Sequence, residues 1–278
     1  MDKDNSVILV TWDFTEKSEY AVSQAVEVAK KFNSRVGLIH IVKKESEIKP
    51  IEDKIKAYLS EKMSHLEDEP LLFVKAGNIF TTITDTANDI NAEMVFMGTH
   101  GIKGMQKLMG SWALKVIAHT KMPFIVVQEP FKKNIFENIV IPVNFRKENK
   151  ECVNWATYFA KHFNTKFHIL TAVHTDSNFV KGIESNKYFI KKYFTSRGIQ
   201  FEMVETPGKN EFFKEVIDFT RENSYDSILA MTTRDIGFAD YVLGAQEQYI
   251  IANEYQIPVI CINPKPPKLG GSFSTAGG

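Results

Sequence analysis

The sequence repeats itself once, and this repeat constrains the fold more than any other feature. The apolar run at residues 7–14, VILVTWDF, returns at 139–145 as IVIPVNF, so that Asp13 corresponds to Asn144 at a spacing of 131 residues. The phrase AKKFNSRVGLIHIV returns at the same spacing as AKHFNTKFHILTAV. Because each unit takes up about half of the 278 residues, the chain is interpreted as two copies of one domain.

Each unit alternates short apolar runs with amphipathic segments. The apolar runs predict buried parallel strands, and the amphipathic segments predict the helices between them. Strand-like segments at 70–75 and 199–205 and apolar runs at 92–98 and 225–231 extend the pattern in both units. Strands that alternate with helices pair in parallel through right-handed crossovers, so we expect an α/β fold with helices on both faces of a sheet.

Both units end in an apolar strand that a proline introduces, at 123–128 and 258–263. An apolar strand left open at the edge of a sheet promotes aggregation. We therefore expect the two strands to pair antiparallel, which would make the chain an intrachain pseudo-dimer.

The repeat also sets the predicted domain boundaries. We expect a first domain at 1–130 and a second at 135–264, joined by a polar segment too short for independent tumbling. Residues 265–278 are rich in Gly and Ser and lack apolar periodicity, so we interpret them as a flexible tail.

Charge is balanced in both units. The chain has 34 Lys and Arg against 34 Asp and Glu, and 18 of each sign precede residue 135. Neither unit has the positive surplus that nucleic acid or an anionic membrane would attract, so we expect neither as a partner. The only cysteines are Cys152 and Cys261, and the sequence shows neither a signal peptide nor a membrane span, which predicts a cytoplasmic protein.

The residues after the strands of the first unit are candidates for a ligand site. In an open α/β sheet, ligands bind outside the carboxyl ends of the strands, where the strand order reverses. Asp13 follows the first strand and suits a ribose hydroxyl or an adenine amine, while Gly110 and Ser111 open a helix whose free N–H groups favour phosphate. Gly98 and Gly101 would let backbone approach an anion, although glycines after a strand are more often part of a tight turn.

The passage GTHGIKGMQKLMGSWALKVIAHTKMPFIVV, together with the Asp that closes the first strand, resembles the universal stress protein family. Because of the repeat, the chain is similar to a tandem two-domain member. The resemblance implies Rossmann-like (adenine nucleotide alpha hydrolase-like) domains with five parallel strands each. It also implies a bound adenine nucleotide, ATP or AMP, with Mg²⁺ accompanying ATP. Carried over residue by residue, it assigns the adenosine and base pocket to Asp13, Ile41, Met97 and Gly98, and the phosphates to Gly101, Gly110 and Ser111.

Three features modify what the resemblance implies. Eight residues separate Gly101 from Gly110 where the family has nine, so a different set of N–H groups would converge on phosphate. His100 lies in this loop, where it could contact phosphate or stabilise the turn. In the second unit, Met231 and Arg234 stand where the first has two glycines, and an Asn replaces the Asp, so we expect a degenerate partner domain.

We therefore expect a stress-response protein that binds an adenine nucleotide in its first domain. A regulatory or interaction scaffold that binds no nucleotide, or a binder of another small ligand, remains the alternative. No positioned general base is evident, so we expect no catalytic residue and at most a weak ATPase. Protein partners and a homodimer of the whole chain are compatible with the sequence.

Two other patterns predict structure. Residues 50–66 have the spacing of an amphipathic helix that starts at Pro50. His162, His168 and His174 recur every six residues across a helix end and a strand, a spacing that predicts no metal site.

Overall fold

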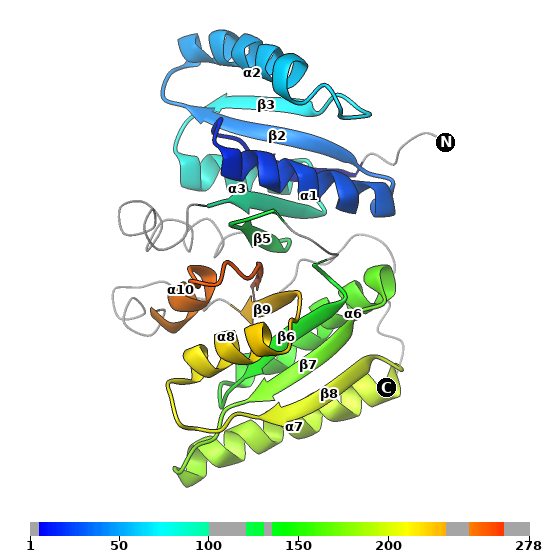
Figure 1. Ribbon diagram of the computed structural model, residues 1–278, viewed down its shortest axis with the longest axis vertical. Helices are drawn as coiled ribbons and strands as arrows, with labels where there is room; N and C mark the ends of the chain where they lie inside the picture. Colours follow the sequence, from blue (N-terminus) through cyan, green and yellow to red (C-terminus); the bar gives the residue numbers. More distant parts are fainter. Residues whose placement is uncertain (1–5, 100–120, 131–134, 232–244, 264–278) are drawn as a thin grey trace.

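The computed structural model describes residues 6–99, 121–130, 135–231 and 245–263. Its strands form one ten-stranded sheet in the order β3-β2-β1-β4-β5-β10-β9-β6-β7-β8. The two halves of the chain lie one above the other in Figure 1, with β5 near the middle. The predicted tail at 265–278 and the helix expected to start at Ser111 lie outside the described residues.

The first half contains, in chain order, β1 (Val7–Thr11), α1 (Glu16–Phe32), β2 (Arg35–Val42), the 3-10 turn η1 (Glu45–Glu47), α2 (Ile48–Lys62), β3 (Leu71–Ala76), α3 (Ile79–Asp89), β4 (Met94–Gly98) and β5 (Phe124–Val127). The second half contains β6 (Asn138–Val143), the 3-10 turn η2 (Lys147–Glu151), α6 (Cys152–Phe163), β7 (Lys166–Thr171), α7 (Ser177–Ser196), β8 (Gln200–Glu205), α8 (Phe212–Glu222), β9 (Ser227–Met231), α10 (Ala245–Ile251) and β10 (Val259–Ile262).

Within each half, all five strands are parallel. The halves meet where β5 and β10 pair antiparallel, with Ile125 opposite Ile260. Both the parallel sheets and this antiparallel joint are confirmed predictions. The proposed boundary between the domains stays a prediction, because residues 131–134 between the halves lie outside the described residues.

Helices cover both faces of the sheet. Along β1, Ile8 and Val10 belong to one apolar core, and Leu9 belongs to the other. The first core packs α1, α2, α6 and α7 against the sheet, and the second packs α3, α8 and α10. This alternation follows from the pleat of a strand, which points successive side chains to opposite faces.

The first helix of each half ends in the same way. α1 stops at Asn33, whose φ of 53° is left-handed, and α6 stops at its repeat counterpart Asn164, with φ 52°. Asparagine tolerates this conformation better than most residues, so it makes a suitable helix C-cap. The ring centroids of Phe32 and its counterpart Phe163 lie 5.4 Å apart, so the ends of the two helices pack against each other.

The predicted helix at 50–66 is displaced. α2 begins two residues earlier than expected, after the 3-10 turn η1, and ends at Lys62. Met63 and Leu66 continue the apolar spacing beyond the helix, because both pack against the core from the loop that leads to β3. Within the described ranges, no helix combines the length and the apolar composition needed to cross a membrane.

Candidate functional site

The strand order reverses between β1 and β4 in the first half. The chain passes outward from β1 to β2 and β3, then returns to place β4 on the other side of β1. Such a reversal opens a crevice at the carboxyl ends of the two strands, because the following loops turn away in opposite directions. The candidate residues Asp13, Ile41, Met97 and Gly98 lie at the carboxyl ends of β1, β2 and β4.

Asp13 is exposed at the end of β1, and its carboxylate is held in one orientation. Oδ1 accepts hydrogen bonds from the backbone N–H of Thr15 at 3.0 Å and from the Thr15 hydroxyl at 2.6 Å. Thr15 is also the N-cap of α1, where its side chain accepts from the N–H of Ser18. The second carboxylate oxygen has no partner in the part of the chain that the structure describes, so it faces solvent as an available acceptor.

Ile41 and Met97 flank the end of β1 from the neighbouring strands. Both are half-buried and pack against the core on the α3 side of the sheet. Thr11 pairs with Met97 in register, and the N–H of Trp12 donates to the Ile39 carbonyl at 2.8 Å. These two apolar side chains therefore lie on one face of the sheet, on either side of β1, as a base pocket would require.

Gly98 has a structural reason to be glycine. A Cβ there would lie 2.1 Å from the carbonyl oxygen of Lys17 and 2.7 Å from the N–H nitrogen of Ser18. The first turn of α1 thus packs directly on the end of β4. The tight-turn interpretation of this glycine explains it without a ligand.

An aromatic cluster supports the loop after Asp13 from the other side of the sheet. Phe14 has a left-handed φ of 63°, uncommon for a bulky residue, and its ring packs edge-on against Trp12, His40 and Tyr58. His40 Nδ1 donates to the carbonyl of Trp12 at 2.7 Å. The Tyr58 hydroxyl donates to the carboxylate of Glu19, which raises the pKa of Tyr58 to about 12.

The remaining candidates belong to the segment after β4. His100, Gly101, Gly110 and Ser111 lie outside the described residues, so their predicted contacts with phosphate stay predictions. Thr99 is the last described residue before them, and it is buried with its N–H donating to the Val127 carbonyl at 2.8 Å. Arg234, proposed in the second half, also lies outside the described part.

The corresponding loop of the second half is held by hydrogen bonds from side chains of the same half. Oδ1 of Asn144 accepts from the Arg146 N–H at 2.9 Å and from Asn149 Nδ2 at 2.8 Å. Asn186, which is 1% exposed on α7, donates through Nδ2 to the carbonyls of Asn144 and Arg146, each at 2.8 Å. Oδ1 thus accepts two hydrogen bonds in both halves, and the second half differs because Asn144 is half-buried and Asn186 binds the carbonyls of its loop.

A polar network at the opposite edge of the second half was not predicted from the sequence. His168 is buried on β7, with Nδ1 2.6 Å from Glu202 Oε1 and Nε2 3.1 Å from Asn138 Oδ1. Tyr225 stacks on the imidazole at 3.6 Å and donates to Glu202 at 3.1 Å. Burial lowers the pKa of His168, and the hydrogen bonds from His168 and Lys166 lower the pKa of Glu202 to about 2.

The repeat contained a signal for this network. The network consists of Asn138, His168, Glu202 and Tyr225. Their counterparts in the first half are small or apolar: Val7, Gly37, Leu71 and Ala92. A position that changes from glycine to histidine between two copies of one domain would have identified the site.

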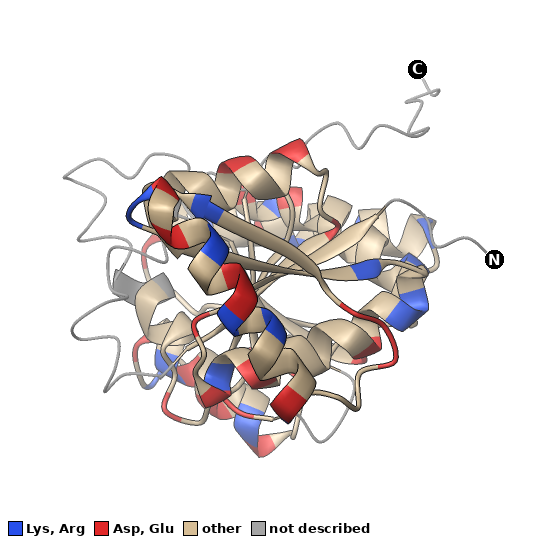
Figure 2. Ribbon diagram, turned by 90° about the horizontal axis from the view of Figure 1, so that it is seen from above, with Lys and Arg blue, Asp and Glu red and all other residues tan. Residues whose placement is uncertain are grey.

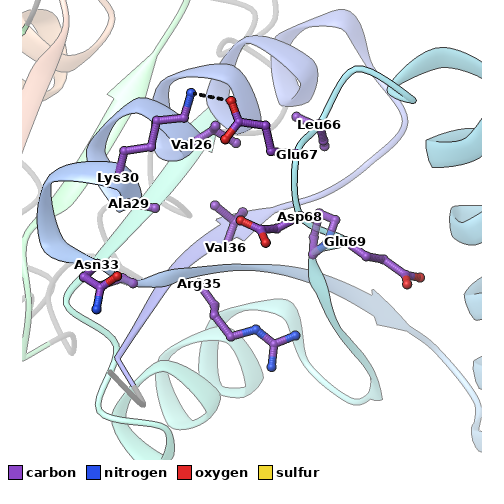
Figure 3. A pocket seen from close by; sticks show the side chains of 12 residues that line it. Val26, Ala29, Lys30, Asn33, Arg35, Val36, Leu66, Glu67, Asp68 and Glu69 are labelled. Carbon is purple, nitrogen blue, oxygen red and sulfur yellow. Dashed lines mark hydrogen bonds and ion pairs between the residues drawn. The ribbon is translucent and has the colours of Figure 1, made fainter. Parts of the chain in front are cut away.

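A hollow of about 340 Å³ lies at the amino ends of β2 and β3, the edge opposite Asp13. In Figure 3, Val36, Val26 and Leu66 line it, and the ion pair of Lys30 with Glu67, at 3.4 Å, reaches across it. Arg35 points to the other side of its strand. The hollow is therefore separate from the candidate crevice, and it shares no residue with it.

Basic and acidic residues, blue and red on the ribbon of Figure 2, are interspersed along the helices. This distribution agrees with the balanced composition of the chain. Among the described residues, no three His, Cys, Asp or Glu side chains are grouped closely enough to hold a metal ion. Cys152 and Cys261 are buried, and burial raises the pKa of the Cys152 thiol to about 12, so this thiol is protonated at neutral pH.

Comparisons with known proteins agree with this architecture. Residues 5–128 match the model of the universal stress protein family. A universal stress protein from Archaeoglobus fulgidus DSM 4304 superposes with a TM-score of 0.70 at 17% identity, over 93% of this chain and 96% of that one. A functionally unknown protein from Pseudomonas aeruginosa PAO1 superposes with a TM-score of 0.58 at 13% identity, over 94% of each chain. The search of curated proteins gives no match.

At these identities, the structural likeness shows the fold, and it extends over both halves. The family model adds a match in sequence over the first half, where the candidate crevice lies. Residues 5–128 therefore form a domain of the universal stress protein family.

Proposed function

We propose that the first half binds an adenine nucleotide, ATP or AMP, at the carboxyl ends of β1, β2 and β4. The observation that carries this proposal is the placement of an exposed, oriented carboxylate between two half-buried apolar side chains at the reversal of strand order. Asp13 offers an acceptor for a ribose hydroxyl or an adenine amine, and Ile41 and Met97 offer apolar surface for the base.

The difference between the halves supports the same proposal. In the second half, Asn144 is neutral and half-buried, whereas Asp13 is charged and exposed. Met231 stands where Gly98 lets α1 approach β4. We therefore assign nucleotide binding to the first half alone and treat the second as a partner domain without a ligand of this class.

Calorimetric titration with ATP and AMP tests the proposal, using the intact chain and its Asp13→Asn variant. Asparagine keeps the oxygen that accepts from Thr15, so the loop retains its support while the negative charge is lost. We expect affinity to fall about tenfold or more, the usual loss when a hydrogen bond to a charged group is removed. Asp53→Asn on the outer face of α2 is the matched control, and it should bind as the parent does.

Two results would contradict the proposal in different ways. If the parent chain binds neither ATP nor AMP, the protein is better described as a regulatory or interaction scaffold, or as a binder of another small ligand. If binding survives Asp13→Asn unchanged, a nucleotide is bound at some other place in the chain.

A further inference from the structure

An ion pair joins the start of α1 to the segment that follows β5. Lys17 Nζ lies 2.8 Å from Glu129 Oε1, although the two residues are 112 positions apart in the sequence. The Lys17 side chain is 17% exposed and that of Glu129 is 41% exposed. The lysine is therefore the better shielded partner, and the carboxylate is the one that solvent reaches more easily.

A backbone contact of Lys17 places this residue next to the candidate crevice. Its carbonyl oxygen packs on Gly98, at the end of β4, and Glu129 lies just beyond the end of the neighbouring strand β5. Adjacent strands are about 4.8 Å apart, so the ion pair spans about one strand spacing at the carboxyl edge. Asp13 closes β1, so the Lys17 ammonium and the Asp13 carboxylate lie at the same carboxyl edge of the sheet, with the end of β4 between them.

The pair is weak enough to be exchanged. Solvent reaches the pair through Glu129, and ion pairs that water screens contribute about 0–1 kcal/mol, in part because two long side chains must be ordered. A phosphate group has up to two negative charges and several acceptor oxygens, whereas Glu129 offers one charge. Where both can reach one ammonium, the phosphate has the larger Coulomb attraction at the same distance.

We propose that Lys17 binds the phosphate end of the nucleotide and that Glu129 is a built-in competitor which the phosphate displaces. This inference rests on the proposed nucleotide site, and it adds the side chain that tells a nucleotide from a nucleoside. Displacement would release the segment at 129–130 from α1 when the ligand binds. Ligand binding would thus change the contacts of the residues that precede the connection between the halves.

The second half has the opposite charge at this point. The repeat counterpart of Lys17 is Glu148, which lies in the 3-10 turn η2 rather than in an α-helix. A carboxylate there repels an anion. The cation is therefore specific to the half in which Asp13 is exposed.

The experiment is a double-mutant cycle, with AMP and adenosine as probes measured by calorimetry on the full chain. Lys17→Gln should lower the affinity for AMP about tenfold. Glu129→Gln should raise the affinity for AMP about twofold to fivefold, because the competing carboxylate is neutralised. The double variant should bind AMP as Lys17→Gln does, and adenosine affinity should stay the same in all four proteins.

Lys17→Arg keeps the charge and should keep the preference for AMP over adenosine, which separates electrostatic binding from a loss of packing. The inference is overturned if Glu129→Gln does not change AMP affinity, or if Lys17→Gln weakens adenosine as much as AMP. If the parent chain binds neither probe, the proposed nucleotide site itself fails and this inference fails with it.

Discussion

The two halves share one topology and differ at the ends of their first strands. In the first half, the loop after β1 leaves one carboxylate oxygen of Asp13 facing solvent, and α1 begins at Glu16 and packs on Gly98. In the second, Asn144 is half-buried, and the buried Asn186 donates to the carbonyls of Asn144 and Arg146. A repeated scaffold can therefore present an open strand end in one copy and a sealed one in the other without a change of fold.

The contact of α1 with β4 should give the largest effect in this comparison. Gly98→Ala would place a methyl group 2.1 Å from a backbone oxygen, so the helix or the strand must shift. We expect unfolding free energy to fall by about 3 kcal/mol. Met231→Ala at the corresponding place in the second half should lower it by only about 1 kcal/mol, because that side chain is half-buried. Equal losses in denaturant titrations would show that the two strand ends are packed alike.

The sealed loop of the second half should give the next effect. Asn186→Ala removes the donor for two carbonyls at a site that is 1% exposed. We expect a loss of about 2 kcal/mol, since buried acceptors without partners are unfavourable. Thr195→Ala, exposed on the same helix, should change stability by less than about 0.5 kcal/mol. If both variants unfold at the same denaturant concentration, the asparagine does not seal the loop.

The His168 network should give the smallest effect, a contribution to stability that is lost in acid. The pKa of Glu202 is lowered from 4.5 to about 2, so its contribution to stability is present above pH 4.5 and is lost as the pH falls toward 2. Because Glu202 is 38% exposed, solvent limits this contribution to below about 1 kcal/mol. Thermal unfolding followed from pH 5 to pH 2 should therefore be less pH-dependent in Glu202→Gln than in the parent.

The matched control for this measurement is Glu205→Gln on the same strand, because Glu205 is 63% exposed and pairs only with Lys187 among the contacts that the structure shows. It should follow the parent curve. A control that flattens the curve as much as Glu202→Gln would mean that the acid sensitivity comes from surface charge in general.

The sequence predicted the fold well because repeat and periodicity act over the whole chain. The matching phrases that contain Phe32 and Phe163 aligned the halves, and the prolines before β5 and β10 marked the two strands that pair. The start of α2 was wrong by two residues, because the turn η1 leads into the helix before Pro50. Turn geometry of this kind depends on Glu47 accepting from two backbone N–H groups, which apolar spacing does not reveal.

The candidate site was predictable only in part. Position after a strand was enough to select Asp13, and the family resemblance added Ile41 and Met97, which the structure brings to adjacent strand ends. The pairing of Lys17 with Glu129 depends on how the end of β5 lies beside α1, and no local pattern contains that distance. Likewise, a buried histidine has no distinctive spacing, although comparison of His168 with Gly37 would have marked it.

The antiparallel joint of β5 with β10 has a consequence for how such a chain diverges. Ile125 faces its own counterpart Ile260, the arrangement expected of a symmetric dimer whose subunits have been joined into one chain. In a dimer of identical subunits, every substitution appears twice, so an exchange such as Gly98 to methionine would alter both strand ends together. Joining the copies removes that constraint, and one copy can lose a residue that the other keeps. The covalent connection thus allows two copies of one domain to acquire different residues while they keep the pairing of a homodimer.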